Sequence, residues 1–588
     1  MKKIILSLIL IITMTGFSNN KLNNGKSDPN ELLLKLFDRN HEYNMRTYPE
    51  WATYEGDHRY DDKVTDNSES AILAGFDTTK AFLDELLSLD YKALSYDNKI
   101  NYDLYKSTLE DALEDKKFNW YYMPLGQQHG IHISFPQIIN SQPLSTYNEY
   151  LKFFSRLYQF GKSIDNTIEL MKKGIETKLM PPGFIMEQTL PQMLNVIKDN
   201  PEESVFYSPL IKENKLSPEE KSLASNELKK IITEVINPFY IKLYDFVKNE
   251  YLPACRNNAG IWSLPEGEER YRKLIKDHTT LNYTAEDIHT IGLNEIKRIL
   301  GEMEKLKDSI GFKGSIDEFN NFLKTDAQFY YTDKDDLMQG FRDILKKMDG
   351  KLPELFGRLP EAKYDLMEME EYRAASAPAA YYYSSPEDRS RPGYFYVNTF
   401  DLPSRPKYTM TALALHEAVP GHHLQIAIAQ ELKNLPKFRR DLGFTAFVEG
   451  WGLYSESLGY ETGMYDDLYQ KYGALTFEMW RACRLVVDTG IHEKKWTREK
   501  AYEFMRKYTP NSDKDIQSEI DRYISWPGQA LAYKIGELKI KELRAKSEKT
   551  LGVKFDIKKF HDEILRNGAI PLPLLEKNID EWISTQIN

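Results

Sequence analysis

Apolar residues recur along most of this chain at three- and four-residue intervals, with lysine and glutamate between them. This spacing is the period of an amphipathic helix, and it is clearest over residues 148–176, 219–249, 283–307 and 493–508. Strand patterns are scarce. The clearest, residues 393–399, is a short aromatic and β-branched segment that begins at a Pro-Gly pair. The pattern therefore predicts a mainly α-helical protein with a small β ribbon.

Three stretches rich in proline and glycine interrupt the helical pattern, at residues 123–144, 178–186 and 376–393. None is a low-complexity sequence, so they are predicted to be ordered loops. The chain has 588 residues, which is enough for about two to four packing units and a deep site. No repeat of fixed period is present, so a solenoid or propeller is not expected.

The first twenty residues have the pattern of a secretory signal peptide. Lysines precede an apolar run from Ile4 to Ile12, and small and polar residues follow it. The run is shorter than the roughly 20 residues of a membrane-spanning helix, so we expect cleavage rather than an anchor, and no stable membrane insertion. Residues 21–29 are expected to form a disordered lead-in. The mature protein is therefore expected to be secreted, or to lie in the periplasm or cell envelope.

Charge and cysteine content narrow the possible partners. The formal net charge is −11, and the sequence lacks the basic patch that nucleic-acid binding requires. We therefore expect no nucleic-acid partner. Cys255 and Cys483 are too few for a disulfide framework, and neither follows the N-terminal apolar run as a lipid anchor would require. Both are expected to be buried apolar residues.

Three of the eleven histidines lie together within residues 415–425. The familiar zinc helix places two histidines four residues apart, with a glutamate between them that serves as the base. Here Pro420 stands at the fourth position after His416, so the simple motif fails. On an unbroken helix His422 would point away from His416, and His423 would lie roughly 10 Å further along the axis. Neither could share a metal ion with it.

Pro420 and Gly421 change this geometry. Proline lacks a backbone donor and glycine tolerates unusual dihedral angles, so the helix can bulge here and bring a later histidine back beside His416. If the bulge accommodates two extra residues, the sixth residue after His416 takes the place that the fourth has on a regular helix. This favours His422 over His423 as the second ligand. The alternative is a helix that merely kinks at the proline, with its histidines packed in a core or exposed.

A second helical segment carries two glutamates that suit a metal site. Zinc hydrolases commonly use three protein ligands and leave one position for water, and Glu449, 33 residues after His416, offers the third ligand. The sequence therefore predicts one Zn²⁺ per chain, bound by His416, His422 and Glu449. Glu417, which adjoins a ligand, is then the catalytic base. Glu456, two turns after Glu449, can orient a ligand imidazole; the alternative is a solvated or ion-paired charge.

These motifs resemble the bacterial family called domain of unknown function 885, whose members are regarded as zincin-like metallopeptidases. The family pattern, His-Glu-x-x-Pro-Gly-His followed by Glu-Gly-Trp-x-Leu-Tyr, is met by residues 416–422 and 449–454. Further matches lie at residues 484–492, 522–523, 527–534 and, more weakly, 52–56 and 391–393. The resemblance therefore extends from about residue 30 to the C-terminus.

The resemblance implies a relative of the helical carboxypeptidases and dipeptidyl carboxypeptidases, with zinc in a deep cleft between two mostly helical halves. We place these halves at residues 30–260 and 261–588, with the zinc motif in the second half and the β ribbon near the site. The resemblance also implies peptide hydrolysis with Glu417 as general base. In the family the histidine after Pro-Gly is the shared ligand, which agrees with His422 and leaves His423 as a supporting neighbour.

Peptide hydrolysis develops negative charge on the carbonyl oxygen, and a Tyr, His or Arg donor usually helps the metal to stabilise it. Tyr533 is the first candidate, one to two turns into a helix that the Pro-Gly pair at 527–528 can start. His492 is the second, because Asp488 four residues earlier can hold it in one tautomer. The alternative for His492 is an ordinary helix histidine with an ion-pair neighbour.

Three further residues are candidates for substrate binding. Arg522 and Tyr523, just before the Pro-Gly pair, can bind a substrate carboxylate or shape the cleft wall, and an ordinary surface position is the alternative for the arginine. Asn398 lies in the candidate strand, whose exposed edge beside the metal can hold an extended peptide by main-chain hydrogen bonds. The alternative for Asn398 is packing.

The sequence thus predicts a secreted zinc metallopeptidase with a peptide substrate. A non-catalytic zinc- or peptide-binding protein of the cell envelope is an alternative, against which the presence of Glu417 argues. A zinc amidase that acts on cell-wall peptides is another, because the same metal and base serve any amide bond.

Overall fold

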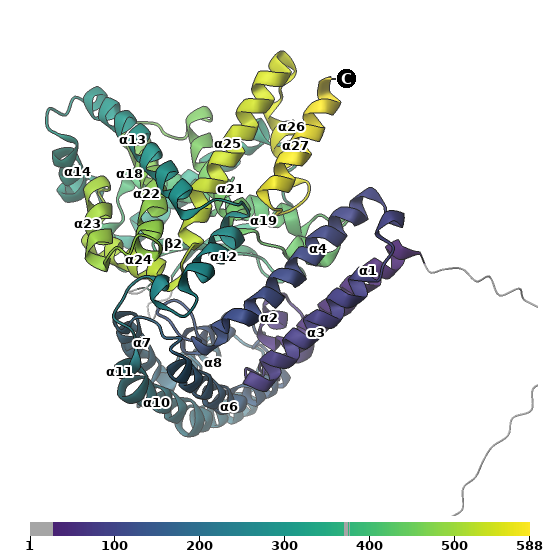
Figure 1. Ribbon diagram of the computed structural model, residues 1–588. Helices are drawn as coiled ribbons and strands as arrows, with labels where there is room; N and C mark the ends of the chain where they lie inside the picture. The colour runs from purple at the N-terminus through teal and green to yellow at the C-terminus, as the bar shows by residue number, and fades with distance from the viewer. Residues whose placement is uncertain (1–27, 370–373, 375–376, 588) are drawn as a thin grey trace, which may run out of the picture.

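The computed structural model describes residues 28–369, 374 and 377–587. Within them the protein is mainly helical, with one small sheet (Figure 1). The predicted signal peptide lies outside the described residues. So does the predicted lead-in, apart from Asp28, which caps the first helix, and Pro29, which begins it.

The N-terminal helices, purple to dark blue, fill the lower part of the view in Figure 1. They are α1 (Pro29–Thr47), α2 (Pro49–Tyr54), α3 (Glu69–Leu87), α4 (Tyr96–Asp115), α5 (Ile131–Ser134), α6 (Tyr147–Thr177), α7 (Gly183–Val196), α8 (Ser208–Ile211), α9 (Pro218–Ile231), α10 (Asn237–Phe246) and α11 (Leu252–Ala254). The predicted helix at 148–176 is α6. The one predicted at 219–249 is α9 and α10, which π-helical turns join and continue. A shared core of α6, α7, α9 and α10 includes Phe160 and Tyr240.

The C-terminal helices form the upper part of the same view. They are α12 (Gly267–Thr279), α13 (Ala285–Ile310), α14 (Ile316–Thr325), α15 (Lys334–Asp349), α16 (Leu352–Leu355), α18 (Lys407–Glu417), α19 (His422–Gln430), α20 (Lys437–Asp441), α21 (Thr445–Glu461), α22 (Leu468–His492), α23 (Arg498–Tyr508), α24 (Asp513–Ser525), α25 (Ala532–Leu551), α26 (Ile557–Leu565) and α27 (Leu572–Ile587). The predicted helix at 283–307 is α13. The one predicted at 493–508 is helical only from Arg498, because the chain turns through Lys495, whose φ is +58°.

The small sheet lies in sequence between α16 and α18. Its strands are β1 (Tyr364–Glu368), β2 (Ala380–Tyr383) and β3 (Gly393–Val397), in the order β1-β3-β2. The central strand β3 is parallel to β1 and antiparallel to β2. The predicted strand at 393–399 is therefore correct in place, and the small ribbon is a mixed three-stranded sheet. One of its edges, β2, falls within the loop predicted at 376–393.

Helix α22 forms the centre of the C-terminal part. Every residue from Arg481 to His492 is buried. Helix α13 packs closely along it at Gly292, where a Cβ would lie 2.7 Å from Val486 Cγ2. Helices α18, α21 and α25 also contact α22. A helix enclosed in this way can carry polar side chains only if other elements supply their partners.

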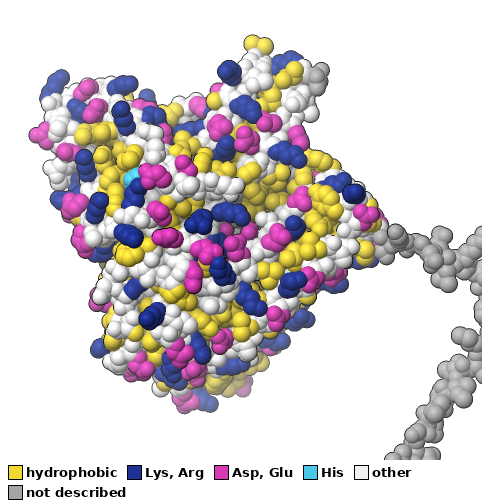
Figure 2. Space-filling model, in the orientation of Figure 1, with side chains coloured by type: hydrophobic (Ala, Val, Ile, Leu, Met, Phe, Trp, Pro, Cys, Tyr) yellow, Lys and Arg dark blue, Asp and Glu magenta, His cyan; other side chains and the backbone are white. Residues whose placement is uncertain are grey.

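On the face that Figure 2 shows, lysine and arginine side chains are intermixed with aspartate and glutamate, and no large field of one sign is visible. The surface is hollowed between the projecting ends of α13 and α25. Within the described part of the chain, no helix combines the length and the apolar character that a membrane span requires.

Candidate metal centre

A break in the helical path after His416 brings His422 beside it. Helix α18 ends at Glu417, and α19 begins at His422. The Val419–Pro420 peptide bond in the connection is cis, and a Cβ on Gly421 would lie 1.9 Å from His416 O, so the turn has no room for a side chain there. The two imidazole centroids are 4.7 Å apart. The expected bulge is thus a complete interruption between two helices.

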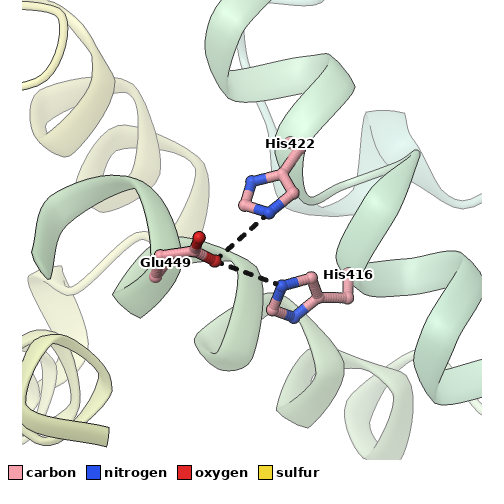
Figure 3. Close-up of side chains that lie close together, drawn as sticks. All are labelled: His416, His422 and Glu449. Carbon is pink, nitrogen blue, oxygen red and sulfur yellow. Dashed lines mark ion pairs between the residues drawn. The ribbon is translucent and has the colours of Figure 1, made fainter. Parts of the chain in front are cut away.

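The side chains of His416, His422 and Glu449 converge on one point (Figure 3). Glu449 Oε2 lies 3.6 Å from His416 Nε2 and 3.4 Å from His422 Nε2. One donor atom of each residue lies within 4.8 Å of the other two. Zinc binds nitrogen and oxygen at roughly 2.0–2.2 Å, so ligand atoms at tetrahedral angles lie about 3.3–3.6 Å apart. The three residues therefore have the donor chemistry and the spacing of a single zinc site.

A second carboxylate fixes the orientation of His416. Its Nδ1 donates to Glu456 Oε1 at 2.8 Å, which leaves Nε2 facing Glu449. A carboxylate on the far nitrogen is a usual partner of a zinc-ligand histidine. Burial alone would lower the pKa of His416, but the neighbouring carboxylates of Glu449 and Glu456 raise it to about 9. Burial also disfavours charge on Glu449, yet the two histidines hold its pKa well below the usual range, so it stays ionised as a metal ligand must.

Glycines next to Glu449, the third candidate ligand, let helix α21 lie close to α25 and to the His416 side chain of α18. A Cβ on Gly450 would lie 2.5 Å from Gly536 Cα, so α21 and α25 are in backbone contact at these residues. A Cβ on Gly452 would lie 2.8 Å from His416 Cε1. The imidazole of His416 therefore occupies the space that a side chain at position 452 would need.

Trp451 connects the helix of the third ligand to the break between α18 and α19. Its side chain is fully buried, and Nε1 donates to Pro420 O at 2.8 Å. This bond fixes the connection that sets the angle between the two histidine helices. The Glu-Gly-Trp-Gly segment thus supplies a candidate ligand, Glu449, and three packing contacts that position it.

Tyr533, on α25, lies beside the ligands. Its ring centroid is 6.2 Å from that of His416. Its hydroxyl accepts a hydrogen bond from Arg522 Nη2 at 3.1 Å, and Gln529 Nε2 lies 3.4 Å from the same oxygen and 3.5 Å from Glu449 Oε1. Because both neighbours donate, the hydroxyl hydrogen of Tyr533 remains available for another acceptor.

Glu417 is the last residue of α18 and adjoins a candidate ligand. Its side chain is half-buried, and it has no hydrogen bond or ion pair with the residues that the structure describes. Its negative charge contributes to the raised pKa of His416, so the carboxylate acts on the site electrostatically. A carboxylate that is close to the candidate ligands and has no competing partner is suited to accept a proton.

The profile of a family described as bacterial protein of unknown function, DUF885, matches residues 49–579. The chain belongs to this family. Among solved structures, a candidate lipoprotein from Colwellia psychrerythraea is similar with a TM-score of 0.88 and 28% identity, covering 95% of this chain and 100% of its own. A candidate lipoprotein of unknown function from Shewanella oneidensis shares the fold, with a TM-score of 0.69 and 20% identity over 93% and 99% of the two chains. A comparison with curated proteins gives no match.

His423 of this DUF885 chain faces the sheet. Its Nδ1 lies 2.8 Å from the Tyr382 hydroxyl, and its ring is 4.6 Å from that of Tyr364. Burial lowers the pKa of His423 to about 4, so the ring is neutral. His423 therefore anchors α19 to strands β1 and β2 and contacts neither His416 nor Glu449 through its polar atoms.

The structure does not pair Asp488 with His492 as the helical spacing suggested. His492 Nδ1 accepts from Ile261 N at 3.0 Å, and Nε2 lies 3.0 Å from Tyr523 O. Burial lowers the pKa of His492 to about 3, and both ring nitrogens are occupied by the backbone, so it has no nitrogen to offer a substrate. Asp488 instead accepts from the Tyr271 hydroxyl at 2.6 Å and from a backbone N–H of the Pro-Gly turn.

Asn398 and Tyr523, which were predicted to bind substrate, instead form hydrogen bonds within the protein. The Asn398 side-chain amide donates to the backbone oxygens of Ala374 and two neighbours, and its oxygen accepts from Phe400 N. The Tyr523 hydroxyl accepts from Arg484 Nε at 2.8 Å and from a tryptophan N–H. Asn398 thus shapes the loops that flank β2 and β3, and Tyr523 supports the arginines behind Tyr533.

Sequence reasoning assigned no role to Gln529, Arg481 or Arg484, which the structure places around Tyr533. One feature of the sequence could have indicated the role of the two arginines. The segment of α22 that carries the arginines places Arg481, Arg484 and Asp488 at three- and four-residue spacing, on one face of an otherwise mostly apolar helix. Buried arginines require partners, and this requirement points to a polar network.

Proposed function

We propose that this protein is a zinc-dependent peptidase with His416, His422 and Glu449 as metal ligands. The proposal rests on one observation, the convergence of two imidazole Nε2 atoms and a carboxylate oxygen on a single point. The zincin-like character that the sequence resemblance implies agrees with this geometry. The two helical halves would then enclose the zinc in a cleft.

A buried oxygen without a hydrogen-bond partner supports the binding of zinc by these residues. Glu449 Oε2 is buried and accepts no hydrogen bond from the described residues, although it lies between the two histidines. Three protein ligands are the usual number for a catalytic zinc, and they leave one position for water or substrate. When bound, zinc would polarise the scissile carbonyl and lower the pKa of a water toward about 7.

The protein's own groups would carry out the proton transfers. Glu417 takes a proton from the water as its oxygen bonds to the carbonyl carbon, and it passes that proton to the amine when the C–N bond breaks. The Tyr533 hydroxyl donates to the carbonyl oxygen as negative charge develops there. Arg522 and Gln529 hold that hydroxyl in position from its other side.

The sheet offers a means to hold the peptide. Strand β2 is an edge strand and contacts α18, the helix that carries His416 and Glu417. An extended substrate can add to such an edge through main-chain hydrogen bonds. The bond between Tyr382 and His423 would keep this edge at a fixed distance from α19.

The proposed location is the cell envelope or the exterior of the cell. The Colwellia protein, 28% identical over nearly the whole chain, is described as a candidate lipoprotein. The apolar N-terminal run of this chain agrees with export. Peptides in the envelope or the medium would then be the substrates.

Metal analysis and peptide cleavage by the Glu417→Gln variant test this proposal. The purified protein should contain one zinc per chain and cut members of a mixed peptide library, and a chelator should abolish the cuts seen by mass spectrometry. Glu417→Gln should keep the zinc and lose about 10²- to 10⁴-fold in rate, the contribution of general acid–base catalysis. Glu461→Gln, at an exposed position of α21, is the matched control.

Two outcomes would contradict the proposal. If Glu417→Gln cleaves at the wild-type rate, Glu417 is not the base. If the wild type binds zinc but shows no chelator-sensitive cleavage of any peptide, the envelope binding protein replaces the peptidase. Cleavage confined to cell-wall peptides would favour the amidase.

A further inference from the structure

Three arginines contact Tyr533, the proposed carbonyl donor. The Arg484 guanidinium lies 4.4 Å from the ring centroid and that of Arg481 lies 6.0 Å from it. Arg522 donates to the hydroxyl at 3.1 Å. Together these residues place three positive charges around the Tyr533 side chain.

The carboxylates around this group do not balance its charge. Glu519 Oε2 lies 2.8 Å from Arg484 Nη2 and 3.6 Å from Arg522 Nη1. Glu456 Oε1 lies 3.7 Å from Arg481 Nη2, but the same oxygen accepts the hydrogen bond of a candidate ligand histidine. Arg481 Nε and Arg484 Nη1 are buried without hydrogen-bond partners among the described residues. Buried charge is costly unless it is paired, so a further anion at this position would be strongly favoured.

Arg522 is the member of the group that a ligand can reach. Its side chain is 15% exposed, against 4% for Arg484 and 6% for Arg481. Both of its hydrogen bonds start from Nη2, while Nη1 lies outside hydrogen-bond distance of Glu519. One edge of the guanidinium therefore remains free to bind a carboxylate.

A cavity adjoins this group. It has a volume of about 120 Å³, and its lining includes Leu413 of α18, Trp480 of α22 and Glu519 of α24. Trp480 also stacks against the Arg484 guanidinium at 5.0 Å. The cavity thus extends between the helix that carries Glu417 and the elements that hold the arginines.

We infer that Arg522, supported by Arg484 and Arg481, binds a carboxylate of the substrate, and that the protein prefers peptides with a carboxylate just after the scissile bond. The inference rests on the proposed peptidase function. In the proposed mechanism the Tyr533 hydroxyl, which contacts Arg522, would also contact the scissile carbonyl oxygen. The carboxylate would then lie about one residue away, since successive Cα atoms are about 3.8 Å apart. A free C-terminus and an acidic side chain are two sources of this group.

Binding to the full-length Glu417→Gln protein, measured by calorimetry, tests the inference without turnover. The probes are acetyl-Ala-Ala-Phe-Ala as the free acid, the same peptide as its amide, and an amide with glutamate as the last residue. The free acid should bind roughly 10- to 100-fold more tightly than its amide, the range of charge-assisted hydrogen bonds. If the glutamate amide binds as tightly as the free acid, the site accepts a side-chain carboxylate as well as a C-terminal one; if it binds like the plain amide, the site requires the C-terminal carboxylate.

Substitution of Arg522 assigns the preference to this residue. In the same Glu417→Gln background, Arg522→Met should reduce the ratio of acid to amide affinity to near one. Arg522→Lys should restore part of this ratio, because lysine returns the positive charge but not the planar guanidinium that binds a carboxylate with two hydrogen bonds. Arg506→Met, at an exposed position on α23, should keep the full ratio. Equal binding of all three peptides, or a ratio that survives Arg522→Met and Arg522→Lys, would overturn the inference.

This proposal and the peptidase proposal can fail separately. Cleavage that is sensitive to a chelator but equal for acid and amide would retain the peptidase and reject the carboxylate site. Selective acid binding that depends on Arg522, in a protein that cuts no peptide, would retain the carboxylate site and reject the peptidase.

Discussion

Glu456→Gln is the substitution that best separates a metal site from a buried ion-pair cluster. Glu456 Oε1 receives the Nδ1–H of His416 at 2.8 Å, and the two side chains are only 4% and 2% exposed. Glutamine has the same size and keeps an oxygen that can accept this hydrogen bond. It removes the negative charge that strengthens Nε2 as a ligand and that faces Arg481 at 3.7 Å.

The expected loss follows from the difference between a charged and a neutral hydrogen bond. A hydrogen bond to a charged group contributes about 1.5–3 kcal/mol and a neutral one about 1 kcal/mol, so the difference is about 0.5–2 kcal/mol. This corresponds to a zinc affinity about 2- to 30-fold weaker. Glu456→Ala removes the acceptor as well, and should approach the 100-fold upper range for substitutions of residues that orient a ligand.

Competition with a chromogenic chelator measures the zinc affinity of each variant. Glu461→Gln is a matched control, because Glu461 lies on the same helix, is 43% exposed and pairs with Arg544 away from the ligands. Thermal unfolding shows whether each variant retains the fold. If both Glu456 variants bind zinc as tightly as the wild type while His416→Ala does not, then Glu456 does not orient the ligand and the reasoning fails.

Three further predictions follow from the contacts of the site. Tyr533→Phe should keep zinc and lower kcat by about 10²-fold or more, and unchanged kinetics would exclude it as the carbonyl donor. His422→Ala should lose zinc and His423→Ala should keep it in metal analysis; the reverse would exchange their roles. Gly452→Ala places a methyl 2.8 Å from the ligand imidazole and should destabilise the protein by about 1–3 kcal/mol in chemical unfolding, whereas Gly301→Ala, with nothing within 4 Å, should not.

Local patterns predicted the helices well and the sheet poorly. The three- and four-residue spacing over 148–176 gave the position of α6 to within a residue at each end, because one face of that helix is buried in a core of its own. The Tyr-rich segment that forms β2 was expected to be a loop. Its strand character depends on pairing with β3, which local spacing does not reveal.

The site shows the same division between local and long-range information. The candidate ligands were predicted because helix geometry limits which histidine can return to His416 past a proline and a glycine. Asp488 and His492 were paired because they are four residues apart on a helix. In the structure both find partners far away in sequence, Tyr271 and Ile261, and no spacing within α22 could show this. Burial from all sides, rather than periodicity, decides which neighbours such residues bind.

The ligand geometry is set by packing that does not require a metal. Backbone contact between Gly450 and Gly536 fixes the crossing of α21 and α25, and the bond from Trp451 to Pro420 fixes the connection between the two histidine helices. In small zinc domains metal binding and folding are one event, because no site exists before the metal arrives. Here helix packing already brings the three donors within 4.8 Å of one another. Metal binding would therefore need little rearrangement, and the residues around the ligands would contribute to affinity by keeping the site in this arrangement.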